Sequence, residues 1–486
     1  MKIRFLVPPA IFAAALAFFY PIQFSTQNIP GFDGFYHIKL ASIISHQGIV
    51  HEFPWFWHTP GGFIDIHFLY HLLLVPFTSV DLIEGAKLST VVFFSIFSVV
   101  FYYALKTSKV PLPWVWLALC LIISTEFLYR MSLPRAPLVA LSFLFMGACL
   151  VAGGKYKAVF FLTFAFVWLY GGFTLFVLLA CFIVLSQWVV ERRVDDRSLA
   201  AVLLGAAAGL VVNPYFPENA FFLFAQTFSA GVDRMVPGGE EWKPYGAVAL
   251  LTSHLSLVFL LAATASVFAS VRKKPRPDTL GWVLFLILVI CLTLRSRRFV
   301  EYLVPVAVMA GALLFRDGWR ESPLHSRFTS RGIGLLVQAA LVAALLFIGG
   351  RQIDAAKKEL RDPRATGRYQ QAALWLKTHT PGSTIFNTDW DDFPELFFYN
   401  SRNRYVAGLD PAFLYLYDQS LYRKWVDISQ GALEGDPYPV LRNDFKTPYL
   451  FTDLRHGRFI RLMEKHPLIE LVYKDAHAHI YRLRKK

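Results

Sequence analysis

The sequence is poor in charge. Only 17% of its 486 residues are Asp, Glu, Lys or Arg, whereas 55% are hydrophobic. Soluble domains carry roughly a quarter charged residues, so an ordinary soluble enzyme is excluded and the bilayer is predicted to surround most of the chain. The net charge of +14 does not indicate a nucleic-acid partner, because Lys and Arg fall in short clusters between apolar runs, where topology signals belong.

Cysteine is scarce as well. The four cysteines lie inside apolar runs, at Cys120, Cys149, Cys181 and Cys291. None lies in the polar segment after residue 350, which excludes a disulfide framework or a cysteine metal site there. The sequence also lacks a repeat of fixed period and a low-complexity tract, so no repeat architecture is expected.

Long apolar runs are abundant. A helix that rises about 1.5 Å per residue needs roughly twenty apolar residues to cross about 30 Å of hydrocarbon. This length predicts about eleven spans, near residues 4–23, 87–105, 111–126, 136–153, 157–170, 173–190, 198–213, 246–271, 279–294, 301–315 and 332–350. The first run resembles a signal peptide but is long enough to span, so we expect an uncleaved first helix. The stretch 157–190 is either one tilted helix or two helices broken at Tyr170-Gly171-Gly172.

The basic clusters favour two helices in that stretch, because only then do Lys106/Lys109, Lys155/Lys157, Arg192/Arg193/Arg197, Arg272–Arg276 and Arg316–Arg331 share one side. The N-terminus is therefore predicted to be cytoplasmic, in the inner membrane of a bacterium or archaeon. An odd number of spans then places the loops 24–86, 127–135 and 214–245 on the outer side together with everything after Arg351. The prediction is a polytopic α-helical membrane domain over 1–350 and an extracytoplasmic domain over 351–486.

The segment 351–486 changes character. Helical signals over Asp354–Lys377 give way to alternating and aromatic segments separated by Pro, Gly and Asn turns. The final segment Leu468–Leu483 predicts two short strands joined by a turn at Lys474-Asp475. We expect a small soluble domain of mixed α/β type on the outer membrane surface.

The first outer loop holds a candidate catalytic acid. Asp33 opens the segment Asp33-Gly34-Phe35-Tyr36-His37, shortly after the end of a span. Such a carboxylate suits a general base or a ligand of a divalent cation, with Tyr36 and His37 as substrate contacts. The alternative is that Asp33 only caps the helix that follows. The same loop carries His51, His58, His67 and His71 near Trp55 and Trp57, a pattern that an interfacial helix explains more simply than zinc.

Arginines form a candidate phosphate site. Arg295, Arg297 and Arg298 lie between two spans on the outer side, where basic residues are statistically disfavoured. Guanidinium groups pair bidentately with phosphate oxygens, so this trio predicts a phosphate or pyrophosphate site, to which Arg130 and Arg135 of another outer loop would add. The alternative is arginines at helix ends that bind ordinary anionic lipid.

Two acidic segments complete the candidates. Glu240 and Glu241 follow a Gly-Gly turn in the loop 214–245, where they either close over a substrate or form a solvated loop tip. In the segment 351–486, which we also call the tail, Trp390 adjoins Asp391 and Asp392. This arrangement suits recognition of a sugar or an acceptor. The alternative there is an exposed acidic turn.

Together these segments resemble the catalytic subunit of oligosaccharyltransferases, within the GT-C class of membrane glycosyltransferases that use polyprenyl-phosphate donors. Asp33–His37 is similar to the family's Asp-x-Tyr-Tyr-His segment, which implies that Asp33 coordinates a divalent metal and meets the acceptor. Glu240 or Glu241 resembles its outer-loop glutamate, and Arg298-Phe299 its Arg-Phe near the lipid phosphate. The run from Trp375 to Phe393 resembles the family's Trp-Leu-x-x-x-Thr-Pro segment and the acceptor motif that follows it.

The chain also departs from that family. Arg135-Ala136-Pro137 stands where a second acidic pair is expected, and Glu126 is the only acid nearby. Trp390-Asp391-Asp392-Phe393 replaces the family's Trp-Trp-Asp-Tyr-Gly, and fewer spans are predicted than the family has. A related GT-C branch is therefore indicated.

The resemblance implies an enzyme with a GT-C-like fold. It would move a sugar or oligosaccharide from a polyprenyl-phosphate or pyrophosphate carrier to a glycan, lipid or protein acceptor, by an inverting displacement on the outer face. The expected catalytic residues are Asp33, Glu240 and Glu241, of which Asp33 and Glu241 would hold Mg or Mn. The alternative is a transporter or flippase for lipid-linked glycans, which predicts paired ionisable groups or broken helices in matched halves, a pairing that the sequence does not show. An inert membrane anchor ranks last.

Overall fold

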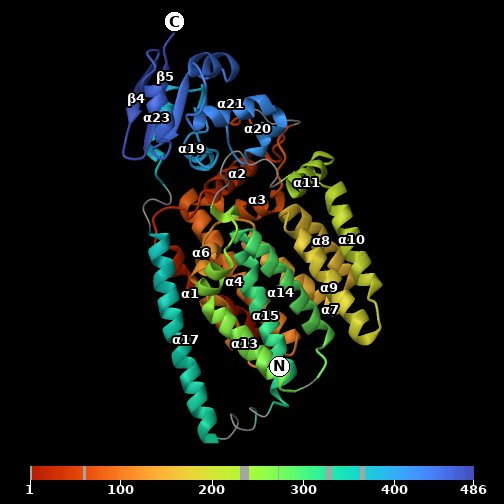
Figure 1. Cartoon of the computed structure of the whole chain (residues 1–486). Helices are drawn as coiled ribbons and strands as arrows, with labels where there is room; N and C mark the ends of the chain where they lie inside the picture. Colours follow the sequence, from red (N-terminus) through yellow and green to blue (C-terminus); the bar gives the residue numbers. More distant parts are fainter. Residues whose placement is uncertain are drawn as a thin grey trace.

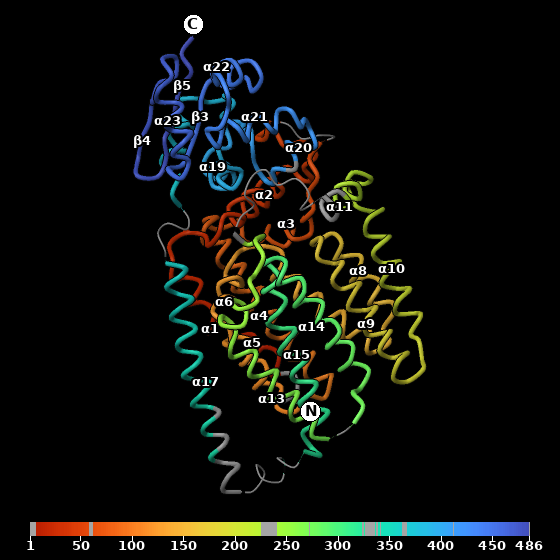
Figure 2. The backbone as a smooth tube through the Cα atoms, viewed as in Figure 1, coloured from red at the N-terminus to blue at the C-terminus, as the bar shows by residue number. Residues whose placement is uncertain are grey.

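The computed structural model describes residues 3–57, 62–229, 240–271, 273–322, 325, 331–361 and 367–485. A bundle of helices forms one part, and a small domain built around a sheet lies at one end of it (Figure 1). The N-terminal end of the chain lies at the opposite end of the bundle, and the backbone trace shows the same separation (Figure 2). One of the histidines named above, His58, lies outside the described residues.

The bundle is made of apolar helices: α1 (Ile3–Gln23), α4 (Leu82–Thr107), α5 (Pro113–Ile122), α6 (Thr125–Met131), α7 (Pro137–Ala152), α8 (Tyr156–Leu169), α9 (Phe173–Glu191), α10 (Asp196–Val211), α12 (Ala247–Ser253), α13 (Leu255–Ala269), α14 (Pro277–Arg295), α15 (Val300–Trp319) and α17 (Arg331–Leu360). Among the described residues, 5 helices are long and apolar enough to cross a membrane, and 7 spans result if each of two bent pairs counts as one. The chain is an integral membrane protein, and the count of eleven spans stays a prediction.

The stretch 157–190 contains two helices, as the basic clusters indicated. Helix α8 ends at Leu169, Tyr170 is extended with φ −170° and ψ 140°, and α9 begins at Phe173. A Cβ atom at Gly172 would collide with the Tyr170 ring and lie 2.9 Å from the hydroxyl of Tyr302. Glycine at this position therefore lets the Tyr170 side chain fold back over the break.

Two of the predicted spans are sharply bent. Helices α5 and α6 meet at 85°, and α12 and α13 meet at 84°, with Ser124 and His254 at the breaks. The Ser124 hydroxyl accepts a hydrogen bond from Phe127 N at the start of α6 and lies 3.4 Å from His254 Nδ1. The spans predicted near 111–126 and 246–271 each contain such a bend, and most of the predicted loop 127–135 is helix α6.

The two long loops that were predicted to lie on the outer side contain helices of their own. Loop 24–86 forms α2 (Asp33–Gln47), α3 (Phe68–Leu74) and the 3₁₀ helix η1 (Val75–Ser79), and α2 and α3 lie between the bundle and the sheet domain (Figure 1). Loop 214–245 forms α11 (Glu218–Ser229) and the short 3₁₀ helix η2 (Glu240–Trp242). A further 3₁₀ turn, η3 (Arg297–Phe299), joins α14 to α15.

The C-terminal domain has a 5-stranded sheet of order β2-β1-β3-β5-β4. Strands β1 (Thr384–Asn387), β2 (Arg404–Tyr405) and β3 (Tyr449–Asp453) run parallel, and β4 (Ile469–Lys474) and β5 (Ala478–Leu483) form the antiparallel hairpin predicted at the C-terminus. Alternate side chains of the strands enter two cores, one against each face. The surrounding helices are α18 (Gln370–His379), α19 (Phe393–Tyr399), α20 (Ala412–Tyr417), α21 (Gln419–Ser429), α22 (Pro437–Pro439), the π-helical turn η4 (Val440–Asp444) and α23 (Gly457–Glu464).

The membrane part supplies one side of this domain. Phe56 forms a parallel bridge with Tyr405 of β2, so the first outer loop extends the sheet at its edge. Phe53 and Phe56 are buried in the same core as Phe393 and Phe397 of α19. The interfacial helix expected around Trp55 and Trp57 is not present, because these aromatic residues pack on the sheet domain.

Candidate active site

A cavity of about 910 Å³ lies where the bundle, α2 and the sheet domain meet. Its lining includes ten of the predicted site residues: Asp33, Tyr36, His37, Arg130, Arg135, Glu241, Arg297, Arg298, Trp390 and Asp391. Three others do not line it: Arg295 is exposed and Asp392 is fully buried, and the side chain of Glu240 lies outside the described part of the chain. The structure therefore brings together residues that are up to several hundred positions apart in the sequence.

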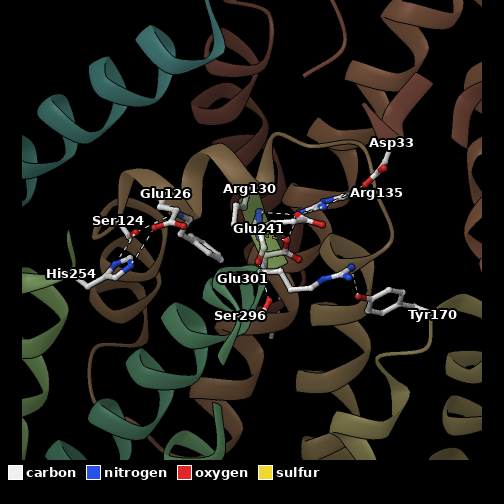
Figure 3. Close-up of polar contacts among 12 residues, drawn as sticks. Asp33, Ser124, Glu126, Arg130, Arg135, Tyr170, Glu241, His254, Ser296 and Glu301 are labelled. Carbon is white, nitrogen blue, oxygen red and sulfur yellow. Dashed lines mark hydrogen bonds and ion pairs between the residues drawn. The ribbon is translucent and has the colours of Figure 1, made fainter. Parts of the chain in front are cut away.

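Arg135 is the centre of an ion-pair network (Figure 3). Its Nη1 lies 2.9 Å from Glu241 Oε2 and 3.5 Å from Asp33 Oδ2, and its Nη2 donates to Glu301 Oε1. Arg130, on the last turn of α6, lies 3.3 Å from both Glu241 and Glu301. Buried charges require such partners, because transfer from water to a low-dielectric interior is costly for an unpaired ion.

Glu301 was not among the site residues predicted from the sequence. It lies in the first turn of α15, only 1% exposed, and was treated as the first residue of an apolar span. The available signal was its type, because an acid within a membrane segment is rare and marks a functional site by default. Its partners were beyond prediction, since Arg135 is 166 positions away in the chain.

Replacing Glu301 by Gln is expected to lower the stability of the protein. The amide still fills the space but carries no charge, so Arg130 and Arg135 keep only Glu241 and Asp33 as counter-ions. We expect a loss of about 1–3 kcal/mol, seen as a lower Tm in detergent solution. Glu321→Gln, which breaks the exposed pair with Lys273, is the matched control and should leave Tm nearly unchanged. Equal Tm values for the two variants would contradict the structural role of Glu301.

The two arginines of η3 that line the cavity, Arg297 and Arg298, are held by aromatic rings. The Arg298 guanidinium lies 4.4 Å from the centre of the Trp242 ring and donates a hydrogen bond of 3.2 Å to the Tyr170 hydroxyl. Arg297 lies 5.1 Å from the centre of the Tyr245 ring. These contacts fix the guanidinium planes while leaving N–H groups for a ligand in the cavity, as phosphate recognition requires.

Asp33 lies in the first turn of α2, and Phe32 is the N-cap residue. No side-chain hydrogen bond caps the start of this helix, so the interpretation of Asp33 as a cap is not supported. About half of its side chain (52%) remains open to the cavity. Desolvation raises the pKa of the Asp33 carboxyl, an effect that Arg135 opposes. A carboxylate with a raised pKa is a stronger proton acceptor than an ordinary aspartate.

Glu241 has a different electrostatic setting. Burial raises the pKa of its carboxyl, but Arg135, Arg298 and Arg130 together bring that pKa below its ordinary value. Glu241 is therefore ionised and acts as a counter-ion of the arginines. Asp33 and Glu241 bind the same Nη1 atom of Arg135, so the guanidinium lies between the two carboxylates that were predicted to share a metal ion.

As arranged, these residues do not fit a divalent cation. In the part of the chain that the structure describes, no group of three or more His, Cys, Asp or Glu residues is placed to hold a metal ion, the histidines of loop 24–86 included. Arg135 already provides the positive charge between Asp33 and Glu241. We therefore derive no step through a metal.

The sheet domain contributes an acidic group to the cavity. Four aspartates surround Arg455, whose Nη2 lies 3.4 Å from Asp389, 3.5 Å from Asp391 and 3.7 Å from Asp392, and whose Nε donates to Asp453. Burial and the neighbouring Asp389 raise the pKa of Asp391 to about 7. Although burial raises the pKa of Asp453, hydrogen bonds from His456 and Arg455 bring it down to about 2. The alternative of an exposed acidic turn does not hold, because these aspartates are largely buried around one arginine.

This cluster predicts a pH-dependent stability. An unfolded aspartate has a pKa of about 3.9, so between that pH and about 7 the folded state keeps a proton on Asp391 that the unfolded state has lost. Stability is therefore lost as the pH rises through this window. Asp391→Asn should increase the free energy of unfolding at pH 8 by on the order of 2 kcal/mol, seen as a higher Tm, and should leave Tm unchanged near pH 4. Asp444→Asn, at the exposed pair with Lys424, should show neither effect.

The fold of the whole chain is that of the GT-C glycosyltransferases. The sequence matches no protein-family model, and no curated protein sequence matches it. Among solved structures, the oligosaccharyltransferase of Archaeoglobus fulgidus, in complex with Zn and sulfate, superposes with a TM-score of 0.63 at 12% identity, over 98% of this chain and 73% of that one.

Two further structures share the fold. ArnT from Cupriavidus metallidurans, bound to undecaprenyl phosphate, gives a TM-score of 0.61 at 12% identity over 97% of both chains. The arabinofuranosyltransferase AftD from mycobacteria gives 0.53 at 12% identity, over 98% of this chain and 41% of that one. The resemblance read from short motifs is thus confirmed at the level of the fold.

Proposed function

We propose that this protein is a membrane glycosyltransferase that moves a sugar or oligosaccharide from a polyprenyl-phosphate or pyrophosphate carrier to a glycan, lipid or protein acceptor on the outer face of the membrane. One observation carries the proposal: a single cavity between the membrane part and the sheet domain is lined by Asp33, Arg135, Arg297, Arg298 and Trp390. This cavity offers a base, a phosphate site and an aromatic surface at the same place.

In the proposed reaction, Asp33 takes the proton of an acceptor hydroxyl or amide. The acceptor atom bonds to the anomeric carbon while the bond from that carbon to the phosphate oxygen breaks, with inversion. The electron pair leaves with the phosphate, whose added negative charge Arg298 and Arg297 stabilise. Preorganised charges of this kind are usually the largest catalytic term in a water-poor site.

The tail is proposed to bind the acceptor. Trp390 and Asp391 line the same cavity from the sheet domain as Arg297 and Arg298 do from η3. An aromatic ring packs on the apolar face of a sugar, and carboxylates accept hydrogen bonds from its hydroxyls. The lipid carrier would reach the cavity along the bundle, since ArnT, whose structure contains undecaprenyl phosphate, shares this fold.

The direct test is transfer by the purified full-length protein. It would be incubated with radiolabelled polyprenyl-phosphate sugars and cell-envelope acceptors, with and without a chelator. We expect label to move to the acceptor, and to move with the chelator present because Arg135 provides the charge between Asp33 and Glu241. Movement of the whole lipid-linked sugar across a bilayer without transfer would instead support a flippase.

A further inference from the structure

Three buried side chains, Asp65, His71 and His37, are connected by hydrogen bonds, and the last of them lines the cavity. Asp65 Oδ2 lies 2.7 Å from His71 Nδ1, and His71 Nε2 lies 2.8 Å from His37 Nδ1. Asp65 is 3% exposed and His71 is fully buried, whereas His37 lines the cavity together with Asp33, one helical turn away on α2. The function proposed above uses neither Asp65 nor His71.

For an ionised Asp65 and a neutral His71, the chemistry of the groups sets the direction of both hydrogen bonds. An ionised carboxylate only accepts, so His71 Nδ1 carries the proton that it shares with Asp65. In a neutral imidazole the other nitrogen is then an acceptor, and His71 Nε2 accepts from His37 Nδ1–H. His37 Nε2 is left without a proton, and its lone pair is what the ring presents to a ligand.

The surroundings keep His37 neutral. Burial lowers the pKa of His37 well below its usual range, and the charge of the nearby Arg135 guanidinium lowers it further. Burial also lowers the pKa of His67 to about 3. The rings around His37 are those of Tyr36, His67, Tyr70 and His71, while the carboxylates of the neighbourhood are Asp65, reached through His71, and Asp33 on the same helix.

We propose that His37 Nε2 is a hydrogen-bond acceptor for a hydroxyl group of a carbohydrate bound in the cavity, and that Asp65 and His71 are positioning residues that hold His37 in this accepting form. The inference rests on the proposed function and narrows its substrate. A neutral hydroxyl would donate to the lone pair, whereas a carboxylate or phosphate oxygen at this place would be repelled by it. The anionic part of a donor belongs at Arg297 and Arg298, and the hydroxyl-bearing ring belongs at His37.

One substitution reverses the direction of both hydrogen bonds and leaves the shapes of the side chains unchanged. Asp65 Oδ1 accepts a hydrogen bond of 2.9 Å from the backbone N–H of His67. In an Asp65→Asn variant the amide oxygen keeps that bond, so the amide NH₂ faces His71 and donates to Nδ1. His71 then carries its proton on Nε2, and His37 carries its proton on the nitrogen that faces the cavity.

The first measurement needs no substrate. Nitrogen-15 NMR of histidine-labelled full-length protein in lipid nanodiscs reports which ring nitrogen carries the proton. We expect His37 to be protonated on Nδ1 alone in the wild type and on Nε2 in Asp65→Asn. A wild-type His37 protonated on Nε2 would overturn the proposal, and this result stands even if the variant does not fold.

The second measurement is kinetic. Loss of the hydrogen-bond acceptor on His37 should raise KM about 10- to 100-fold for the substrate that supplies the hydroxyl, with a smaller change in kcat. A rise in the donor KM assigns the hydroxyl to the transferred sugar, and a rise in the acceptor KM assigns it to the acceptor. His46→Gln is the matched control, because His46 is exposed on the same helix and bonds only to its own turn.

Unchanged KM values for both substrates in an Asp65→Asn variant with a reversed tautomer would also overturn the proposal. If the wild type transfers no sugar at all while His37 carries its proton on Nδ1, the proposed glycosyl transfer is wrong and the assignment of the hydrogen bonds remains.

Discussion

Asp33→Asn is expected to lower kcat for glycosyl transfer by about 10²- to 10⁴-fold, the usual contribution of a general base. Asparagine keeps the size and the hydrogen-bonding oxygen of the side chain but does not take up a proton. The fold should be unaffected, because Asp33 makes one long, half-exposed ion pair with Arg135. Single-turnover transfer from a labelled donor separates the chemical step from product release.

Glu52→Gln provides the control for this result. Glu52 belongs to the same outer loop, is exposed and does not line the cavity. The control should insert and turn over like the wild type. Full turnover by Asp33→Asn would remove Asp33 from the mechanism, whereas loss of activity in both variants would point to a defect of the loop as a whole.

Arg298→Ala is expected to have the second large effect. Its guanidinium is held by Trp242 and Tyr170 at the cavity wall, where the leaving phosphate is proposed to gain charge. Removal of one such donor typically costs about 10²- to 10³-fold in kcat. Arg298→Lys should restore only part of the activity, because an ammonium group lacks the planar fork that stacks on Trp242 and pairs with two phosphate oxygens.

Arg295→Ala is the matched control for Arg298→Ala. The two arginines are three positions apart and have the same charge, but Arg295 is exposed at the end of α14 and does not line the cavity. Transfer should be close to that of the wild type. An equal loss in both variants would mean that the whole cluster attracts anionic lipid, and the phosphate site at Arg298 would then be wrong.

The sequence predicted the parts of this molecule that depend on local properties. Apolar run length located the helices, and the break at Tyr170 followed from the basic clusters on either side of it. The C-terminal hairpin followed from alternation and its turn. The bends at Ser124 and His254 were not predicted, because hydropathy measures how long an apolar run is and carries no information on its direction.

The candidate site was predicted by residue type more than by arrangement. Asp33, Arg298 and Trp390 were found because a carboxylate, a guanidinium and an aromatic ring each have a distinctive chemistry. The pairing of Arg135 with Glu301 was not found, nor was the enclosure of the tail aspartates around Arg455, since both depend on long-range packing. Arg295 was predicted to share the phosphate site with Arg297 and Arg298. It does not line the cavity, because it is the exposed last residue of α14, and the sequence spacing alone did not reveal this.

The bridge between Phe56 and Tyr405 has a consequence for how the two parts of the chain depend on each other. A segment near the N-terminus adds an isolated bridge at the β2 edge of the sheet, and it also supplies several aromatic residues of one of the cores, Phe53 and Phe63 among them. A fragment beginning at residue 367 would expose an unpaired edge strand beside a hydrophobic aromatic surface. This combination promotes self-association. The tail is therefore not a free-standing ectodomain, and any rigid movement of it would carry α2, and with it Asp33, along.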